Sequence, residues 1–309
     1  MTILLLESLH AEAEALLSEA GGVVRAAAPD HPGPEIHYED VRAIVTRGRG
    51  PVSAALIGRC PRLRTVARAG VGIDNVDLAA ARARGILVLY APGSNTATTA
   101  EHAIALMLAL ARRIPAQARA VAEGRWEERA RYDGDEVCGK TLGIVGYGAI
   151  GRRVARIAAA LGMQVVVAAH PSLACEHPVM PLAELLRRAD FVSLHLPLRA
   201  ETRGLIGAAE LAAMKPGAIL LNTARGALVD QHALAAALAA RRIGGFAADV
   251  LDPEPPAPGE PLLRGERVLI TPHVASLTAS TYRELCLLTA RNVLAALRGE
   301  PLDPRWVHP

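Results

Sequence analysis

Aromatic residues are scarce in this 309-residue sequence, and the scarcity argues against a nucleic-acid-binding protein. Phe, Trp and Tyr together make up 3% of the residues, and the formal net charge is only +3. Proteins that bind nucleic acid usually carry a strongly basic patch, often with aromatic rings between the basic residues. No stretch of that kind occurs here, so we expect no nucleic-acid partner.

Cysteine is also rare, which argues against a disulfide framework and against a zinc module. The four cysteines lie far apart and form no Cys-x-x-Cys pair: Cys60, Cys138, Cys175 and Cys286. Residues 170–177 hold two histidines, a cysteine and a glutamate, but not at zinc-finger spacing. We therefore expect no metal, and reduced thiols in a cytoplasmic protein.

Apolar runs long enough to cross a membrane are missing as well. Residues 104–110 are apolar but far too few to span a bilayer. Residues 2–6 are followed at once by Glu7 and lack a basic segment before them, so they predict a first strand and not a signal peptide. We expect a soluble protein without a membrane partner.

A glycine-rich turn stands near the middle of the chain. Gly146, Gly148 and Gly151 have the spacing Gly-x-Gly-x-x-Gly between an apolar run that begins at Thr141 and a helical pattern over 152–161. In dinucleotide-binding domains the first glycine allows a tight turn, the second lets the backbone approach a pyrophosphate, and the third lets the helix pack on the strand. The turn therefore predicts a dinucleotide site.

Strand-like and helix-like segments alternate on both sides of this turn, which predicts parallel sheets covered by helices. Expected strands are 2–6, 23–26, 43–46, 64–68, 87–90, the run from 141, 164–169, 191–194, 219–222, 244–248 and 268–270. Expected helices are 11–19, 52–58, 77–84, 97–111, 152–161, 182–188, 208–213, 232–240 and 281–297. Residues 124–139 predict an irregular polar stretch.

The fold class predicted is α/β, with two doubly wound parallel-sheet domains. Residues 1–96 plus 286–309 would form a flavodoxin-like substrate domain, and residues 97–285 an inserted Rossmann dinucleotide-binding domain. Helical connections near 97–111 and 276–298 would then form a hinge, with the ligand site between the domains.

Three polar clusters follow expected strands of the second domain. Asn222–Gly226 follows one strand, Asp249 and Glu254 follow the next, and His273 follows the last. Ligands of open α/β sheets bind beyond the carboxyl ends of the strands, so an arginine, a carboxylate and a histidine would converge near a nicotinamide.

These motifs, in their order, resemble the D-isomer-specific 2-hydroxyacid dehydrogenases. The matching segments are Thr46-Arg47, Arg68–Asn75, Ala100-Glu101-His102, Gly146–Gly151, Leu194–Pro197, Asn222–Gly226, Asp249–Pro255 and Thr271–Ser276. The resemblance covers nearly the whole chain. It implies that Arg225 binds the substrate, that His273 is the catalytic acid and base, and that Glu254 is the partner of His273.

The chemistry of these residue types agrees with the implied roles. The guanidinium of Arg225 can hold a planar carboxylate through two parallel hydrogen bonds and polarise the neighbouring carbonyl. A histidine titrates near physiological pH, so His273 can protonate the carbonyl oxygen as hydride reaches carbon. Glu254 would orient the imidazole and favour its charged form.

The remaining expected contacts follow from the glycine motif and the resemblance. Cofactor-binding residues are Gly146, Gly148, Ala149, Ile150, Gly151, Ala169, His170, Leu196, Pro197, Thr202, Thr223, Ala224, Arg225, Asp249, His273 and Ala275. Substrate-binding residues are Arg47, Val71, Gly72, Ser94 and Arg225. His195 is interpreted as structural or close to the cofactor.

The choice between NAD and NADP stays open. NAD-preferring relatives usually place an aspartate at the end of the second strand of this domain, where it repels the 2′-phosphate of NADP. Here the position is Ala169, or His170 if one residue is inserted, and no arginine follows closely. We expect NAD as cofactor, with NADP possible.

The substrate stays open too. Arg47 and Arg49 favour a phosphorylated acid such as 3-phosphoglycerate, whereas a small pocket behind Val71 and Ser94 would accept glyoxylate or hydroxypyruvate. An alternative function is an NAD-sensing, corepressor-like binding protein. By resemblance, the region from residue 97 through Trp126 forms a homodimer interface.

Overall fold

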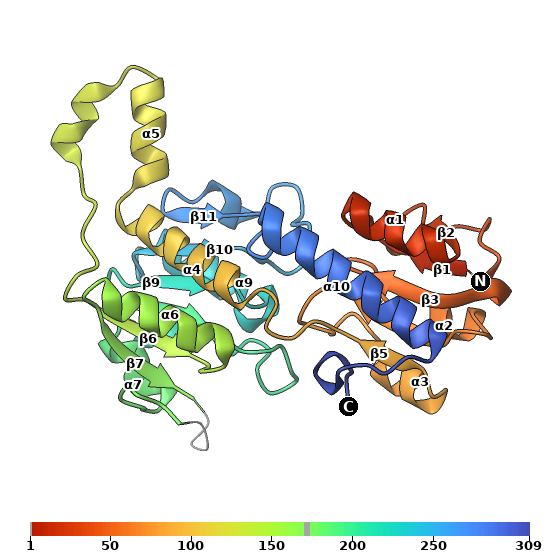
Figure 1. The fold of residues 1–309 in the computed structure, drawn as a ribbon. Helices are drawn as coiled ribbons and strands as arrows, with labels where there is room; N and C mark the ends of the chain where they lie inside the picture. Colours follow the sequence, from red (N-terminus) through yellow and green to blue (C-terminus); the bar gives the residue numbers. More distant parts are fainter. Residues whose placement is uncertain (1, 170–173) are drawn as a thin grey trace. The chain divides into compact units, whose positions relative to one another are not determined.

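The computed structural model describes residues 2–169 and 174–309. It consists of two compact units, unit 1 (Met1–Asn95 with Ser276–Pro309) and unit 2 (Thr96–Ala275) (Figure 1). Each unit is built on a single parallel sheet, with five strands in unit 1 and six in unit 2. The predicted fold class is therefore confirmed.

The sheet of unit 1 has the strand order β2-β1-β3-β4-β5, the flavodoxin-like order. Its strands are β1 (Thr2–Leu5), β2 (Gly22–Arg25), β3 (Val41–Thr46), β4 (Thr65–Arg68) and β5 (Leu87–Leu89). Its helices are α1 (Ala11–Ala20), α2 (Ala54–Arg59), α3 (Leu78–Ala83) and α10 (Ala279–Arg298), with short 3₁₀ turns η1 (Tyr38–Asp40) and η5 (Pro304–Trp306). The strand order reverses between β1 and β3.

Both faces of the sheet are buried at β1, β3 and β4 because apolar side chains continue along these strands, whereas the edge strand β2 is largely exposed. Ile3 and Leu5 point into a core shared with α1 and α10, while Leu4 and Leu6 point into a core shared with α2 and α3. Successive side chains of a strand alternate between faces, so an uninterrupted apolar run predicts a strand covered on both sides.

The sheet of unit 2 has the order β7-β6-β8-β9-β10-β11. Its strands are β6 (Thr141–Val145), β7 (Gln164–Ala168), β8 (Phe191–Leu194), β9 (Ile219–Asn222), β10 (Gly245–Ala248) and β11 (Val268–Ile270). Its longer helices are α4 (Thr96–Ala111), α5 (Ile114–Ala122), α6 (Ala149–Ala160), α7 (Leu182–Arg188), α8 (Ala208–Ala213) and α9 (Gln231–Ala239). The 3₁₀ turns are η2 (Trp126–Arg131), η3 (Gly226–Leu228) and η4 (Pro261–Arg264).

Helices α4 and α6 share one core with the sheet of unit 2, and α7, α8 and α9 share the other. The strand order reverses between β6 and β8, so the ends of these two strands flank the topological switch point at which doubly wound sheets bind ligands.

Two features differ from the sequence expectation. Helix α5 was not predicted, because Pro115 suggests a break; Pro is instead tolerated at the first positions of a helix, and α5 begins there. The expected domain boundary between residues 285 and 286 is wrong as well. The division follows Ala275, because Tyr282, Leu285 and Cys286 of α10 pack in the core of unit 1.

Within residues 2–169 and 174–309, no helix has both the length and the apolar character needed to cross a bilayer. The same residues contain no cluster of three or more His, Cys, Asp or Glu side chains arranged to hold a metal ion.

Candidate active site

The glycines of the turn after β6 have three different environments. Gly146 has φ +96°, and a Cβ there would lie 2.6 Å from the carbonyl oxygen of His195, after β8. A Cβ on Gly151 would collide with the carbonyl oxygen of Gly146. These two glycines are required by the packing of the turn itself. At Gly148, in contrast, a Cβ would meet no other atom within 4 Å among the residues that the structure describes.

The bare backbone at Gly148 fits a dinucleotide. Gly148 is the N-cap of α6, so the unpaired N–H groups of the first helical turn lie beside the position where a side chain is missing. Packing gives no reason for a glycine there, whereas the close approach of a pyrophosphate to a helix N-terminus does. Gly146, Gly148, Ala149, Ile150 and Gly151 would hold the phosphates.

The loop after β9 carries Arg225 and is fixed by Asn222. The buried Asn222 side chain donates to the carbonyl oxygen of Arg225 at 2.8 Å and accepts from the N–H of Ala224 at 3.0 Å. A Cβ on Gly226 would collide with the backbone of Leu251 and Asp252, so the loops after β9 and β10 are in direct contact. Arg225 itself is partly buried, and its Nη1 donates to the carbonyl of Ala224 at 2.7 Å.

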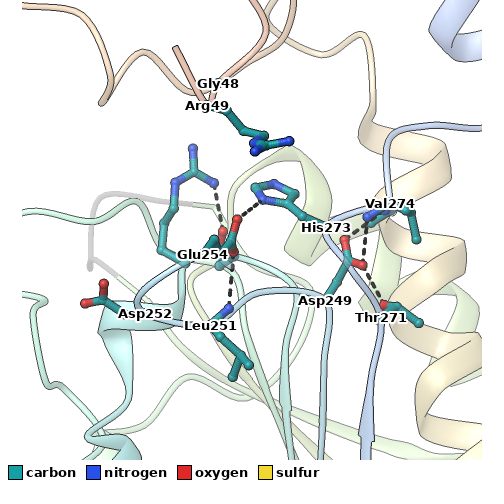
Figure 2. Close-up of polar contacts among 12 residues, drawn as sticks. Gly48, Arg49, Asp249, Leu251, Asp252, Glu254, Thr271, His273 and Val274 are labelled. Atoms are coloured by element: carbon teal, nitrogen blue, oxygen red, sulfur yellow. Dashed lines mark hydrogen bonds and ion pairs between the residues drawn. The ribbon is translucent and has the colours of Figure 1, made fainter. Parts of the chain in front are cut away.

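His273 and Glu254 form a pair at the same end of the sheet. The Nδ1 of His273 lies 2.7 Å from Oε2 of Glu254, while Oε1 of Glu254 accepts from the N–H of Leu251 at 3.2 Å (Figure 2). The His273 side chain remains 44% exposed, so its other ring nitrogen can be reached by a ligand. The predicted partnership of Glu254 and His273 is present in the structure.

His273 adopts a backbone conformation that is rare for residues other than glycine, with φ +55°. Such residues persist only where the surroundings determine them, and they concentrate at functional sites.

Asp249 provides those surroundings. Its carboxylate accepts from the hydroxyl of Thr271 at 2.5 Å, from the N–H of Val274 at 2.9 Å and from the N–H of Ala275 at 2.8 Å (Figure 2). Nε2 of His102 lies 3.5 Å from the carboxylate and 2.9 Å from the Thr271 hydroxyl. Burial acts to raise the pKa of Asp249, but hydrogen bonds from these four groups hold it below its ordinary value.

Asp249 therefore fixes the two residues that follow His273. The expected cofactor contact of Asp249 is replaced by this positioning role, because its side chain is 1% exposed and its oxygens face protein donors. The N–H of Ala275 is likewise used by Asp249 and not left for a ligand.

His195 follows β8 at the switch point and is partly buried. Burial lowers its pKa to about 4, so the imidazole is neutral at physiological pH. Its Nε2 lies 2.9 Å from the hydroxyl of Ser193, which is fully buried in β8. The contact with Gly146 described above makes His195 a support for the turn, in line with its interpretation as structural or near the cofactor.

The expected substrate loops lie at the carboxyl edge of the sheet in unit 1 and are joined by hydrogen bonds. Asn75 donates to the carbonyl of Gly50 at 2.8 Å, and the N–H of Ala91 donates to the carbonyl of Gly70 at 2.8 Å. Val71 and Gly72 are partly exposed in the loop after β4, and Ser94, after β5, donates to the carbonyl of Ala91 at 2.8 Å.

Glu7 occupies the switch point of unit 1 and organises the loop that carries Arg47. Its carboxylate accepts from the N–H groups of Arg47, Gly48, Arg49 and Gly50 and from the hydroxyl of Thr46, at 2.7–3.3 Å. Burial acts to raise the pKa of Glu7, but these hydrogen bonds lower it below the ordinary value. The Arg47 guanidinium lies over the ring of Tyr282 at 4.7 Å and donates to the carbonyl of Ser8 at 3.3 Å.

The other expected cofactor residues divide into three groups. Thr202 closes its own loop, donating to the carbonyl of Pro197 at 2.8 Å. Thr223 has a buried hydroxyl with no hydrogen-bond partner among the described residues, which fits a group that a ligand would satisfy. Leu196, Pro197, Ala169 and Ala224 keep partly or fully exposed surface, and His170 lies outside the described residues.

Sequence reasoning missed Glu7 and the positioning roles of Asn222 and His102. Two of them had a positional signal. Glu7 ends the first apolar run, and Asn222 is a polar residue that closes an otherwise apolar strand. His102 contacts residues far along the chain, and nothing near it in the sequence points to them.

The sequence and the fold are similar to those of known proteins. Residues 104–275 match the D-isomer specific 2-hydroxyacid dehydrogenase, NAD binding domain. The chain is 42% identical to D-3-phosphoglycerate dehydrogenase of Archaeoglobus fulgidus over 84% of its own length and 50% of the relative, so it spans about half the length of that protein. It is 42% identical to glyoxylate reductase of Korarchaeum cryptofilum, over 87% of this chain and 83% of that protein. The crystal structure of the TT0316 protein from Thermus thermophilus superposes with a TM-score of 0.91 at 38% identity over the full length of both chains. The chain therefore belongs to the D-isomer specific 2-hydroxyacid dehydrogenase family, and its residues 104–275 form the NAD-binding part.

Proposed function

We propose that the protein is an NAD(P)-dependent oxidoreductase that interconverts a D-2-hydroxy acid and a 2-oxo acid. The observation that carries this proposal is the His273–Glu254 pair, 2.7 Å apart at the carboxyl edge of a dinucleotide-binding sheet. An exposed imidazole held by a carboxylate is suited to move a proton to or from a substrate oxygen. The same pair favours turnover over the alternative of an NAD-sensing, corepressor-like protein, for which sensing alone would not require it.

In the direction of reduction, the bound reduced nicotinamide supplies a hydride to the carbonyl carbon. Arg225 binds the substrate carboxylate and draws electron density from the carbonyl. His273 donates its proton to the carbonyl oxygen, so the 2-oxo acid gains one hydride and one proton and becomes the 2-hydroxy acid. Glu254 holds the imidazole in place through Nδ1 and stabilises its charged form.

Two substrate classes fit the chain. Arg49 is exposed and could attract a phosphate, in agreement with 3-phosphoglycerate as substrate. Arg47 is held against Tyr282 and the carbonyl of Ser8, so a phosphate would have to compete with these contacts. Small 2-oxo acids such as glyoxylate and hydroxypyruvate carry no phosphate, so they need Arg225 for their carboxylate but neither Arg47 nor Arg49. Turnover rates of these acids with NADH and NADPH, and of 3-phosphoglycerate with NAD and NADP, decide between the classes.

We propose NAD as the preferred cofactor, with discrimination against NADP below about tenfold, or ~1.4 kcal/mol. Ala169 directly follows β7, where NAD-preferring relatives usually carry an aspartate. Alanine has no charge, so this position cannot repel a 2′-phosphate.

We further propose a homodimer formed through the projecting segment α5–η2. This segment stands away from the sheet of its own unit (Figure 1). It carries three large hydrophobic side chains that remain exposed, Ile114, Val121 and Trp126, and exposed Tyr132 follows it directly. Clustered exposed apolar residues mark interaction surfaces, and homo-oligomers are mostly two-fold symmetric. Half of the residues of α4, in contrast, are buried within its own unit.

Light scattering tests the dimer. A wild-type dimer that dissociates in the variant Trp126→Ser supports it, and a wild-type monomer at micromolar concentration contradicts it. The dimer would act in the cytoplasm, with neither nucleic acid nor membrane as partner.

The experiment that tests the proposed function is consumption of NADH in the presence of each 2-oxo acid, with product analysis for the D-isomer. Formation of a D-2-hydroxy acid in amounts equal to the NADH consumed supports the proposal. NADH binding without turnover of any acid would instead support the NAD-sensing alternative.

A further inference from the structure

An arginine side chain is held against the glycine-rich turn, and the Gly-x-Gly-x-x-Gly spacing does not predict it. Arg152, in the first turns of α6, donates from Nε to the carbonyl oxygen of Tyr147 at 3.2 Å. Its guanidinium carbon lies 4.9 Å from the centre of the Tyr147 ring. Arg152 is exposed, and the described part of the chain offers it no carboxylate within 4 Å.

Tyr147 lies against both this arginine and His177, in the segment that follows β7. The residue stands between Gly146 and Gly148, is 4% exposed, and belongs to the same core as Val167 of β7. Ala169 and Cys175, which lie on either side of the undescribed residues after β7, pack against that core. The imidazole of His177 meets the Tyr147 ring edge-on at 6.3 Å.

The end of β7 is where the 2′-position of the adenosine ribose is recognised in this kind of domain. An acidic side chain there excludes a 2′-phosphate, and a nearby arginine accommodates one. This chain has Ala169 in place of the acid, and it has a guanidinium fixed by the carbonyl and the ring of the residue that precedes Gly148. A neighbouring acid, Glu176, is exposed on the loop before His177 and would oppose a phosphate only weakly through solvent.

We propose that Arg152 binds the 2′-phosphate of NADP and is the residue that lets this protein use NADP as well as NAD. The inference deepens the proposed function and depends on it only through the cofactor. Tyr147 is a positioning residue in this account, since its carbonyl and ring fix the guanidinium.

The test measures binding of adenosine fragments and needs no turnover. Dissociation constants of 2′,5′-ADP and 5′-AMP are measured by calorimetry for the wild type and for Arg152→Gln, which can still donate to the Tyr147 carbonyl but has no charge. Arg153→Gln is the matched control, because Arg153 is the next residue of α6 and is also exposed. Arg152→Lys restores the charge without the planar fork.

We expect Arg152→Gln to weaken 2′,5′-ADP about tenfold, or ~1.4 kcal/mol, and to leave 5′-AMP within about twofold. Arg152→Lys should recover part of the loss, and Arg153→Gln should change neither ligand. An equal loss for both ligands in Arg152→Gln, or an equal effect of Arg153→Gln, would overturn the inference.

The outcome is separable from that of the proposed function. A protein that turns over no 2-oxo acid can still show the Arg152-dependent difference between the two fragments. An active dehydrogenase that lacks this difference would refute the role of Arg152 alone.

Discussion

Asp249→Asn tests how the carboxylate that holds the His273 loop contributes to stability and to catalysis. In the wild type, three short hydrogen bonds reach this carboxylate from Thr271, Val274 and Ala275. In the asparagine variant the bonds to the remaining oxygen lose their ionic character, which roughly halves their strength, at about 1 kcal/mol each. The new amide N–H₂ faces the N–H of Ala275, and an unsatisfied buried donor costs about 1–3 kcal/mol.

Together these losses predict a decrease of about 3 kcal/mol in the free energy of unfolding. Urea unfolding at pH 7 measures it, with Asp252→Asn as control. Asp252 is exposed and pairs with exposed Arg203 at 3.3 Å. Loss of this ion pair in Asp252→Asn should change the free energy of unfolding by less than about 1 kcal/mol. Because misplacement by about 1 Å can cost a factor of about 10² in rate, kcat should fall by that order in Asp249→Asn.

The stability difference should also depend on pH. The pKa of Asp249 is lowered in the folded protein, so its contribution is fully present above the unfolded value of about 3.9 and is lost as pH falls through the folded pKa. The wild type and Asp249→Asn should therefore converge in stability as the pH falls. A variant within about 0.5 kcal/mol of wild type at pH 7, or one that is destabilised with undiminished kcat, would refute this reasoning.

Three further predictions concern the cofactor and substrate loops. Arg225→Lys should lower kcat/KM strongly while NADH affinity, measured by fluorescence, changes little, because lysine lacks the bidentate fork; loss of NADH binding with intact substrate binding would mean the role is misassigned. Ala169→Asp should raise the preference for NADH over NADPH in competitive binding through like-charge repulsion, and an unchanged ratio would place the 2′-phosphate elsewhere. Glu7→Gln should destabilise the protein by about 1–3 kcal/mol in urea unfolding because it weakens a carboxylate with five donors; the loss should shrink as pH falls through the lowered pKa of Glu7, and Glu35→Gln, at an exposed site, should have no comparable effect.

The sheets could be predicted from sequence because their strands are short apolar runs with clear ends. Residues 191–194 and 219–222 form β8 and β9 with the predicted bounds. The glycine motif also contained its own structural context, a strand before it and a helix after it. Local patterns of this kind depend on neighbours in sequence, and these are visible without a structure.

Features that depend on distant contacts could not be predicted in the same way. The switch-point role of Glu7 requires knowing that β1 and β3 are adjacent, and the role of His102 requires the position of Thr271. The positioning role of Asp249 follows from its burial, which a motif cannot reveal. Arg152 directly follows the motif but was overlooked, because the carbonyl of Tyr147 that fixes it is specified by backbone geometry and not by residue type.

The most direct test of the central claim is the rate of 2-oxo acid reduction by His273→Asn. Asparagine tolerates the positive φ of this position, so the loop should keep its conformation while the proton donor is lost. With NADH and the best acid of the panel, we predict a decrease in kcat by a factor of about 10² to 10⁴ and an unchanged dissociation constant for NADH. A variant that reduces the acid at nearly the wild-type rate would contradict the account.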